Sequence, residues 1–270
     1  MLLLRAALLL SAATALSPLL LRSSPDAVAW MERVKAADYK GDLTALESLF
    51  KESEELLQNK ENRSRIHYWR GFAMWRKAIN GFNEPALPKG MDKDLLRAAD
   101  EFRAAADADP DFVDAKIGEF SSLGYFMYLN TVSEPKVASE ETIKELGARA
   151  SKLAQACIAA EPANPRLVWV LGPVRWNQTG PRAGQDAAIE SYHKALSAWK
   201  ESPPKAKHPL DPVWGDAELW MNLAWSYLNK RERNVAEAEK CAIEALRLVP
   251  HWHYVKNILM PQIKAAKSGG

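Results

Sequence analysis

Little in the composition of this chain points to chemistry of its own. Two cysteines among 270 residues, Cys157 and Cys241, are too few for a disulfide scaffold or a cysteine-rich zinc site. Basic and acidic side chains nearly balance, 36 against 34, so the sequence carries no electrostatic footprint for nucleic acid. Glycine-rich phosphate loops and the common hydrolase and zinc-protease motifs are absent. We therefore expect no catalytic residue, no cofactor and no nucleic-acid partner.

The histidines offer one weak metal motif. His251 and His253 lie two residues apart, and two imidazoles at this spacing can chelate a metal on an extended segment. No carboxylate or cysteine nearby completes a ligand set, and a new helix should begin directly after Pro250. We expect a structural or surface role for this pair and no metal site, with a histidine-dependent enzyme as the least favoured alternative.

Alternating strand-like patterns are scarce, whereas helical patterns run through most of the chain. Beyond residue 25, apolar residues recur at spacings of three and four, and Ala, Leu, Glu and Lys dominate. Asn164-Pro165 is typical of a helix start, with Asn as the cap and Pro in the first turn. With 47% apolar residues the chain can bury a sizeable core, so the sequence predicts an all-α globular protein.

An internal repeat organises these helices. Residues at offsets of 0, 4 and 7, most of them small, recur on four segments. On three of these segments a proline follows at an offset of 12 from the first residue. Small residues at this spacing let a second helix pack closely, and the proline marks the exit to the next unit. The matching sets are Ala98, Phe102, Ala105 and Pro110; Ala150, Ala154, Cys157 and Pro162; Ala188, Tyr192 and Ala195; and Ala238, Ala242, Ala245 and Pro250.

This pattern resembles the tetratricopeptide repeat family, whose unit is a pair of antiparallel helices of about 34 residues. The resemblance covers roughly residues 65 to 250, with a weaker unit at about 26–58. It implies an α-α superhelix of about four to five units plus a C-terminal capping helix. We expect one repeat domain over residues 24–266 and a flexible tail over 267–270.

The repeats are more widely spaced than in the family, so this chain resembles a divergent member with long insertions. The extra residues fall in proline-bearing stretches. These stretches are Asn80–Asp92, Asn130–Glu141, Asn177–Gln185 and Ser202–Gly215. The first three lie between the two helices of a unit and should emerge on the same rim.

Pro173 lies inside an expected helix. We expect it to end this helix early, although a kink that opens the groove is the alternative.

The N-terminus has the pattern of a targeting segment. The first 25 residues contain no acidic side chain, and Arg5 precedes an apolar run from Ala6 to Leu21. A basic start followed by such a run is typical of a secretory signal. The span Leu2–Leu21 is also long enough for an uncleaved anchor. We expect residues 1–23 to be a signal peptide or membrane anchor, and the protein to be periplasmic or secreted, or tethered through residues 2–21.

Aromatic residues fall on the expected binding surface. In tetratricopeptide repeats the first helix of each pair lines the concave face, which is the usual binding surface. Small residues that mark this helix in successive units are Gly71, Gly124, Gly172 and Ala224. The residues beside them predict an aromatic-lined groove formed by Tyr68, Phe72, Trp75, Tyr125, Tyr128, Trp169, Trp176 and Trp225.

Aromatic residues at helical spacing are also typical of a packed core, and this alternative stays open. Arg65, Arg76, Arg175 and Asn177 lie near the same face and could orient a polar head or a carboxylate.

From these features we expect a non-catalytic scaffold that holds a peptide or partner protein in the aromatic groove. The alternative is a carrier that encloses an apolar small molecule for an envelope transport system. Membrane contact is expected only through the N-terminal segment.

Overall fold

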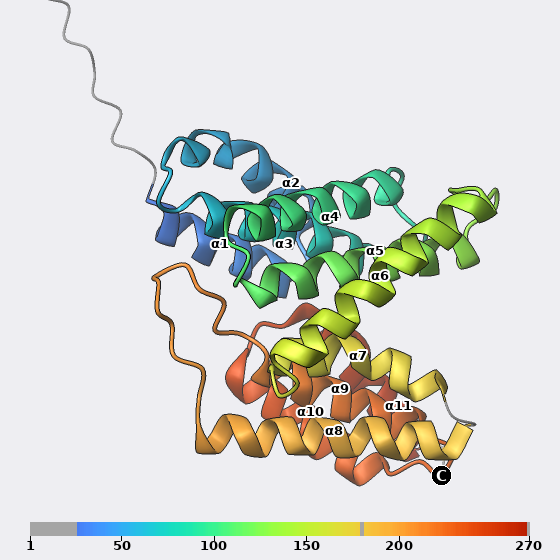
Figure 1. Ribbon diagram of the computed structural model, residues 1–270. Coiled ribbons are helices and arrows are strands. Elements are labelled where there is room, and N and C mark those ends of the chain that lie inside the picture. Colours follow the sequence, from blue (N-terminus) through green and yellow to red (C-terminus); the bar gives the residue numbers. More distant parts are fainter. Residues whose placement is uncertain (1–25, 179–180, 269–270) are drawn as a thin grey trace, which may run out of the picture.

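The computed structural model describes residues 26–178 and 181–268, and all regular structure in these ranges is helical. Consecutive helices pack as hairpins that stack along the chain (Figure 1). The all-α helical-repeat architecture predicted from the sequence is confirmed. The hairpins are α1 (Ala27–Lys40) with α2 (Leu43–Glu52), α3 (Arg63–Gly81) with α4 (Met91–Ala108), α5 (Val113–Val132) with α6 (Glu140–Ala160), α7 (Pro165–Gln178) with α8 (Pro181–Glu201), and α9 (Asp216–Asn229) with α10 (Val235–Leu248).

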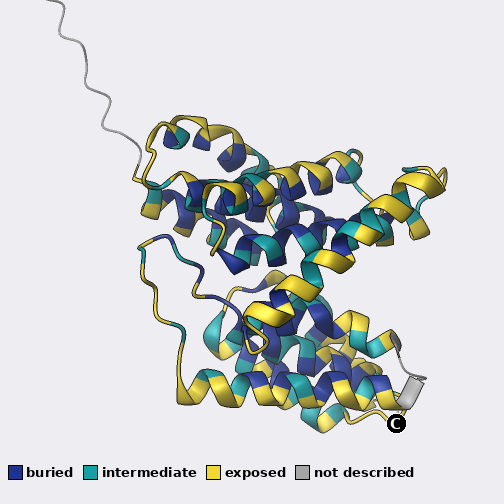
Figure 2. Cartoon of the chain, viewed as in Figure 1, coloured by how far each residue is buried: buried dark blue, intermediate teal, exposed yellow. Residues whose placement is uncertain are grey.

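The small residues of the second helices pack as the repeat predicts. Ala98 and Ala105 of α4, and Ala238 and Ala242 of α10, are completely buried. Their methyl groups allow the first helix of the same hairpin to approach closely. The hydrophobic core therefore follows the seam between the two layers of helices, and the outward faces of the second helices are exposed (Figure 2).

Glycines of the first helices explain part of this close approach. A Cβ atom at Gly71 would lie 3.0 Å from the ring of Phe102. Gly124, which marks the corresponding helix of the next unit in the sequence pattern, does not pack in this way, because nothing lies within 4 Å of a Cβ placed there. Gly118, six residues earlier in α5, makes a close contact instead: its Cβ would lie 2.4 Å from the Phe102 ring.

The N-terminal hairpin begins with a capped helix. The carboxylate of Asp26 accepts hydrogen bonds from the backbone N–H groups of Val28 and Ala29, and Gly41 ends α1 with a φ of 69°. This hairpin and a short 3₁₀ helix, Ser53–Gln58, form the weak unit expected at 26–58. The predicted signal or anchor, residues 1–23, lies outside the described residues. Within the described ranges, no helix combines the length and hydropathy needed to span a bilayer.

Two of the four predicted insertions are loops inside hairpins. Residues 82–90 join α3 to α4, and residues 133–139 join α5 to α6. The third is wrong: α7 continues past Pro173 to Gln178, and α8 begins at Pro181, so neither an early stop nor a long loop occurs there. Pro173 removes one backbone N–H donor and crowds the carbonyl of the residue four positions earlier, yet α7 stays helical across it.

The fourth insertion, residues 202–215 between α8 and α9, is hereafter called the connector. In Figure 1 it rises from the end of α8, reaches the upper hairpins and returns to the middle of the molecule. Its first part is largely exposed, and its last part is largely buried (Figure 2).

The C-terminal segment covers the last hairpin as predicted for a capping helix. A π-helical turn, Val255–Leu259, leads into α11 (Met260–Ser268) just before Pro261. Val255, Leu259 and Ile263 are completely buried. α11 includes Lys267 and Ser268, which were expected to belong to a flexible tail, and Lys267 pairs with Glu239 at 2.7 Å.

The two cysteines are buried free thiols on different helices, Cys157 on α6 and Cys241 on α10. α6 contributes little else to the core, since only Ala150 and Cys157 are buried along its 21 residues. Burial raises the pKa of both thiols, to about 11 for Cys157 and about 12 for Cys241.

We predict opposite effects for two glycine-to-alanine changes in α5. Gly118→Ala forces a methyl group against the fully buried Phe102 ring, and should lower the free energy of unfolding by about 1–2 kcal/mol. Gly124→Ala meets no neighbour and gains helix propensity, so it should raise stability by about 0.5–1 kcal/mol. Urea denaturation of both variants measures the difference. Equal effects would contradict the assignment of Gly118 as the close-packing residue.

Candidate functional site

The face lined by the first helix of each hairpin, which the repeat resemblance predicts to be concave, is hereafter called the concave face. It is largely filled by aromatic rings. Tyr68, Phe72 and Trp75 lie one turn apart on α3, and Trp169 lies on α7. All four are buried, with exposed fractions of 1%, 3%, 1% and 5%. Trp75 and Trp169 meet edge to face at 5.5 Å, a favourable arrangement for aromatic pairs.

Trp214, the penultimate residue of the connector, completes this aromatic cluster. The centroid of its ring lies 5.4, 6.1 and 5.8 Å from the ring centroids of Phe72, Trp75 and Trp169. Its indole N–H donates a hydrogen bond to the hydroxyl of Tyr68 at 3.0 Å. The chain thus inserts its own side chain between α3 and α7.

Leu210 and Asp211, which precede Trp214 in the chain, fasten the connector to α3. The backbone carbonyl of Leu210 accepts a hydrogen bond from the indole N–H of Trp69 at 2.8 Å, and the Leu210 side chain is buried. Asp211 accepts a hydrogen bond from the Arg65 guanidinium at 2.9 Å. Arg65 also pairs with Asp109 and lies 4.1 Å from the centroid of the Phe112 ring.

Electrostatics favour the ionised form of Asp211. Burial alone would raise the pKa of this carboxyl, but hydrogen bonds from Arg65 and from the backbone N–H groups of His208 and Lys207 lower it below its usual value. The contribution of Asp211 to stability is therefore present above its unfolded pKa and lost as the pH falls through the lowered one.

A side chain of α7 binds a second backbone carbonyl of the connector, that of Trp214. Arg166 donates a hydrogen bond to the backbone carbonyl of Trp214 at 2.8 Å and forms a buried ion pair with Asp114 of α5 at 2.6 Å. Asp114 thereby holds the guanidinium in place. Side chains from α3 and α7 consequently bind two backbone carbonyls and one carboxylate of an extended segment.

The groove predicted from the sequence is therefore not open at four of its eight positions. Tyr68, Phe72, Trp75 and Trp169 pack against one another and against Trp214, which is the core alternative. The connector occupies the face these residues would otherwise present, and Phe102 of α4 also contacts the rings of Tyr68 and Trp75.

The remaining four predicted residues lie in two other groups of contacting rings. Trp176 and Trp225 form an edge-to-face pair at 5.2 Å, and Trp225 is 37% exposed. Tyr125 and Tyr128 both contact Phe82 in the loop after α3, at 5.9 and 5.3 Å, and Tyr128 is 54% exposed. No described ring contact joins these pairs to the aromatic cluster.

A buried charged group lies beside the aromatic cluster. Arg76 of α3 pairs with Asp38 of α1 at 2.8 Å, and Asn80 donates a hydrogen bond to the same carboxylate at 2.9 Å. Asp38 raises the pKa of Arg76 despite its burial. Aromatic rings surround the guanidinium, with centroids 5.8, 5.7 and 5.3 Å from its carbon for Phe72, Trp75 and Trp169.

Glu218 of α9 extends this group. Its carboxylate accepts a hydrogen bond from the hydroxyl of Tyr39 at 2.8 Å. Burial raises the pKa of Glu218, and Arg76 and Tyr39 offset this only in part. Five side chains here each have one buried polar atom without a partner among the described residues, a pattern typical of functional or strained sites. They are Asp38, Trp75, Arg76, Trp169 and Glu218.

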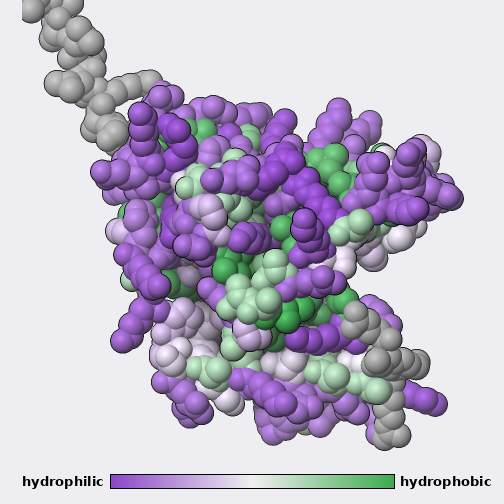
Figure 3. Space-filling view, in the orientation of Figure 1, coloured by the Kyte–Doolittle hydropathy of each residue, from purple (hydrophilic) through white to green (hydrophobic). Residues whose placement is uncertain are grey.

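The two loops inside hairpins lie next to each other, as predicted for insertions on one rim. They border an open hollow of about 510 Å³ with apolar and polar lining. Leu87 and Val132, both partly exposed, lie at its edge. In the orientation of Figure 3 the surface is largely hydrophilic, with apolar side chains gathered in its middle.

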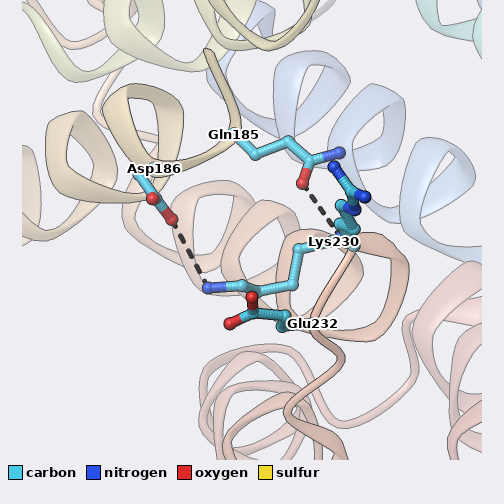
Figure 4. Close-up of a pocket in the computed structure, with 5 residues that line it drawn as sticks. Gln185, Asp186, Lys230 and Glu232 are labelled. Atoms are coloured by element: carbon cyan, nitrogen blue, oxygen red, sulfur yellow. Dashed lines mark hydrogen bonds and ion pairs between the residues drawn. The ribbon is translucent and has the colours of Figure 1, made fainter. Parts of the chain in front are cut away.

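A second, smaller hollow is polar and lies between the start of α8 and the α9–α10 turn. Asp186 of α8 pairs with Lys230 at 3.4 Å, and Gln185 accepts a hydrogen bond from the backbone N–H of Arg231 (Figure 4). These contacts fasten the α9–α10 turn to the start of α8. Among the described residues there is no group of three or more His, Cys, Asp or Glu side chains arranged to hold a metal ion.

Sequence reasoning missed the residues that occupy the concave face. Leu210, Asp211 and Trp214 fall in a stretch that the sequence predicts only as an insertion. A signal is present, because three bulky apolar residues follow prolines within two positions in an otherwise polar stretch. Asp38 and Glu218 were also missed, since nothing local marks a carboxylate that pairs across the array.

We predict that Trp214→Ala lowers the free energy of unfolding by about 3–5 kcal/mol, because it leaves a cavity between α3 and α7. Trp225→Ala, which truncates a partly exposed ring, should cost less than about 1.5 kcal/mol. Chemical denaturation of the two variants distinguishes a core tryptophan from a surface one. Similar losses would contradict the packing described for Trp214.

We predict a pH-dependent gain from Glu218→Gln. Because burial raises the pKa of Glu218, the folded chain binds a proton more tightly than the unfolded chain, so stability falls as the pH rises above the unfolded pKa. The amide keeps an acceptor for Tyr39 and removes this dependence. E218Q should match or exceed the native stability at about pH 8, with the advantage shrinking toward about pH 4. An advantage that grows on acidification would overturn the assignment.

Compared with known proteins, the sequence matches no family model, and no curated protein matches it. The function is therefore argued from the concave face and from the segment held there.

Proposed function

We propose that this chain is a non-catalytic binding protein of the tetratricopeptide type whose concave face holds an extended peptide segment of a partner protein. The observation that supports this most is that the face already binds such a segment, the connector of the same chain. The contact consists of packed aromatic rings and three polar interactions. An indole and a guanidinium each donate to a backbone carbonyl, and one arginine pairs with a carboxylate.

The chemistry of this contact suits peptide recognition. Donors aimed at backbone carbonyls recognise an extended chain whatever its sequence, and pockets for alternate side chains add specificity. Pro209 and Pro212 limit the freedom of the bound segment before it docks, which reduces the entropy lost on binding.

A carrier for an apolar small molecule is less well supported. It needs an enclosed apolar cavity beside residues such as Trp75 and Trp176. Trp75 is buried against Phe72, Trp169 and Trp214, so its ring is already covered by protein. We further propose that the protein is exported or tethered, on the strength of the residue pattern of positions 1–23 alone.

The test uses the chain with residues 203–214 replaced by a Gly/Ser linker of equal length. A displayed library of random 12-residue peptides is selected against it, and the native chain, with its connector in place, is the matched control. We expect selected peptides to converge on a common pattern and to bind the native chain more weakly.

Point variants locate the binding surface. Arg65→Ala in the linker chain should weaken the binding of the selected peptides, because Arg65 contacts the connector in the native chain. Arg63 is exposed and lies two residues away, so Arg63→Ala should leave the binding unchanged. A folded linker chain that selects no peptide, while native mass spectrometry finds a small molecule bound to the unmodified chain, would overturn the proposal in favour of a carrier.

A further inference from the structure

The connector is attached to the concave face in the manner of a bound ligand. Its residues 202–209 are mostly exposed and belong to no helix, although His208 forms a hydrogen bond with Asn62 at 3.1 Å. The five residues from Leu210 to Trp214 carry most of the described contacts with α3 and α7. We propose that partner peptides carry the same anchor pattern, an apolar residue followed by Asp, Pro, any residue and Trp, and that the connector competes with them for the face. This inference rests on the proposed function.

The first anchor is Leu210. Its side chain is 1% exposed and joins the core beside α3. The N–H of Trp69 is directed at its backbone carbonyl, so this position requires an apolar side chain in an extended backbone. A polar residue here would be buried without a partner, which is costly.

The second anchor is the carboxylate of Asp211. Arg65 donates to one oxygen at 2.9 Å, and the backbone N–H groups of Lys207 and His208 donate to the other, each at 2.9 Å. One carboxylate therefore binds the groove and also stabilises the turn that precedes Leu210. Because Arg65 is held by Asp109 as well, its guanidinium is oriented before any ligand arrives.

The third anchor is Trp214. Buried aromatic residues that fill a pocket dominate binding energies in most interfaces. The Tyr68 hydroxyl accepts from its indole N–H, and Arg166 binds its carbonyl, so both the ring and the backbone are fixed. Phenylalanine would fill much of the volume but would leave the Tyr68 hydroxyl without this donor.

The intervening positions set the spacing and little else. Pro212 is buried, which fits a rigid turn between the second and third anchors. Val213 is 43% exposed and its side chain carries no polar atom, so its identity should be free. The spacing of four residues from Leu210 to Trp214 is thus the feature a partner must reproduce.

Competition follows from the covalent attachment of the connector. An attached segment acts at an effective concentration in the millimolar range, so a free peptide of the same sequence binds the native chain far more weakly than the linker chain. A partner therefore gains access by carrying stronger flanking contacts or several copies of the pattern.

The first experiment measures fluorescence anisotropy of a labelled peptide with the sequence of residues 205–217 against the linker chain. Replacing its tryptophan by alanine should weaken binding at least about 30-fold, as expected of a dominant anchor. Replacing its aspartate by asparagine should weaken binding about tenfold. Replacing its valine by alanine is the matched control and should change the affinity less than about twofold.

The second experiment uses the native chain, so it does not depend on the linker chain folding. The tryptophans are labelled with 5-fluorotryptophan, and Trp214→Phe assigns the Trp214 resonance. Excess of the native 205–217 peptide should shift this resonance toward that of an exposed indole. The peptide whose tryptophan is replaced by alanine should leave it in place.

The outcomes separate the two proposals. Library peptides that bind the linker chain but lack the pattern, or that bind the native chain without moving the Trp214 resonance, would overturn the inference and leave the proposed function intact. If neither the library nor the 205–217 peptide yields any binding to either chain, both proposals are overturned.

Discussion

The insertion of Trp214 between α3 and α7 is the contact on which the rest of this structure depends. Helical-repeat arrays usually hold together through contacts between neighbouring units, so their stability is close to a sum of local terms. Here the connector adds hydrogen bonds between residues 141 and 146 positions apart, from the Trp69 indole to the Leu210 carbonyl and from the Trp214 indole to the Tyr68 hydroxyl. These contacts join the early hairpins to the late ones, so they add coupling that neighbouring-unit contacts alone do not supply.

The same insertion explains why aromatic residues accumulate on this face. The rings of α3 and α7 surround two groups from the chain itself, the indole of Trp214 and the guanidinium of Arg76. Arg76 is balanced by Asp38, and each side chain is almost completely buried. Burying an ion pair contributes little net stability, but separating its members is costly, so such a pair favours one register of α1 against α3.

Local patterns in the sequence predicted the fold well and the site poorly. The alanine spacing of α4 and α10 identified the packed seam because those contacts lie within one hairpin. Gly124 was assigned instead of Gly118 because the face a glycine presents depends on the neighbouring hairpin, which spacing does not reveal. The connector was missed for a stronger reason: an extended segment has no periodicity, and its partners lie about 140 residues away. Whether Trp75 lined a groove or a core could be decided only once Trp214 was placed beside it.

The connector also restricts how this array can change in length. A solenoid held only by neighbouring contacts can acquire or lose a hairpin at any position by duplication or deletion of one unit. In this chain, an extra hairpin between α3 and α8 would carry Arg65 and Trp69 away from Leu210 and Trp214, and the connector would no longer reach both. Lineages that retain the connector should therefore vary in repeat number before α3 or after α10, while the span between them keeps a constant number of hairpins.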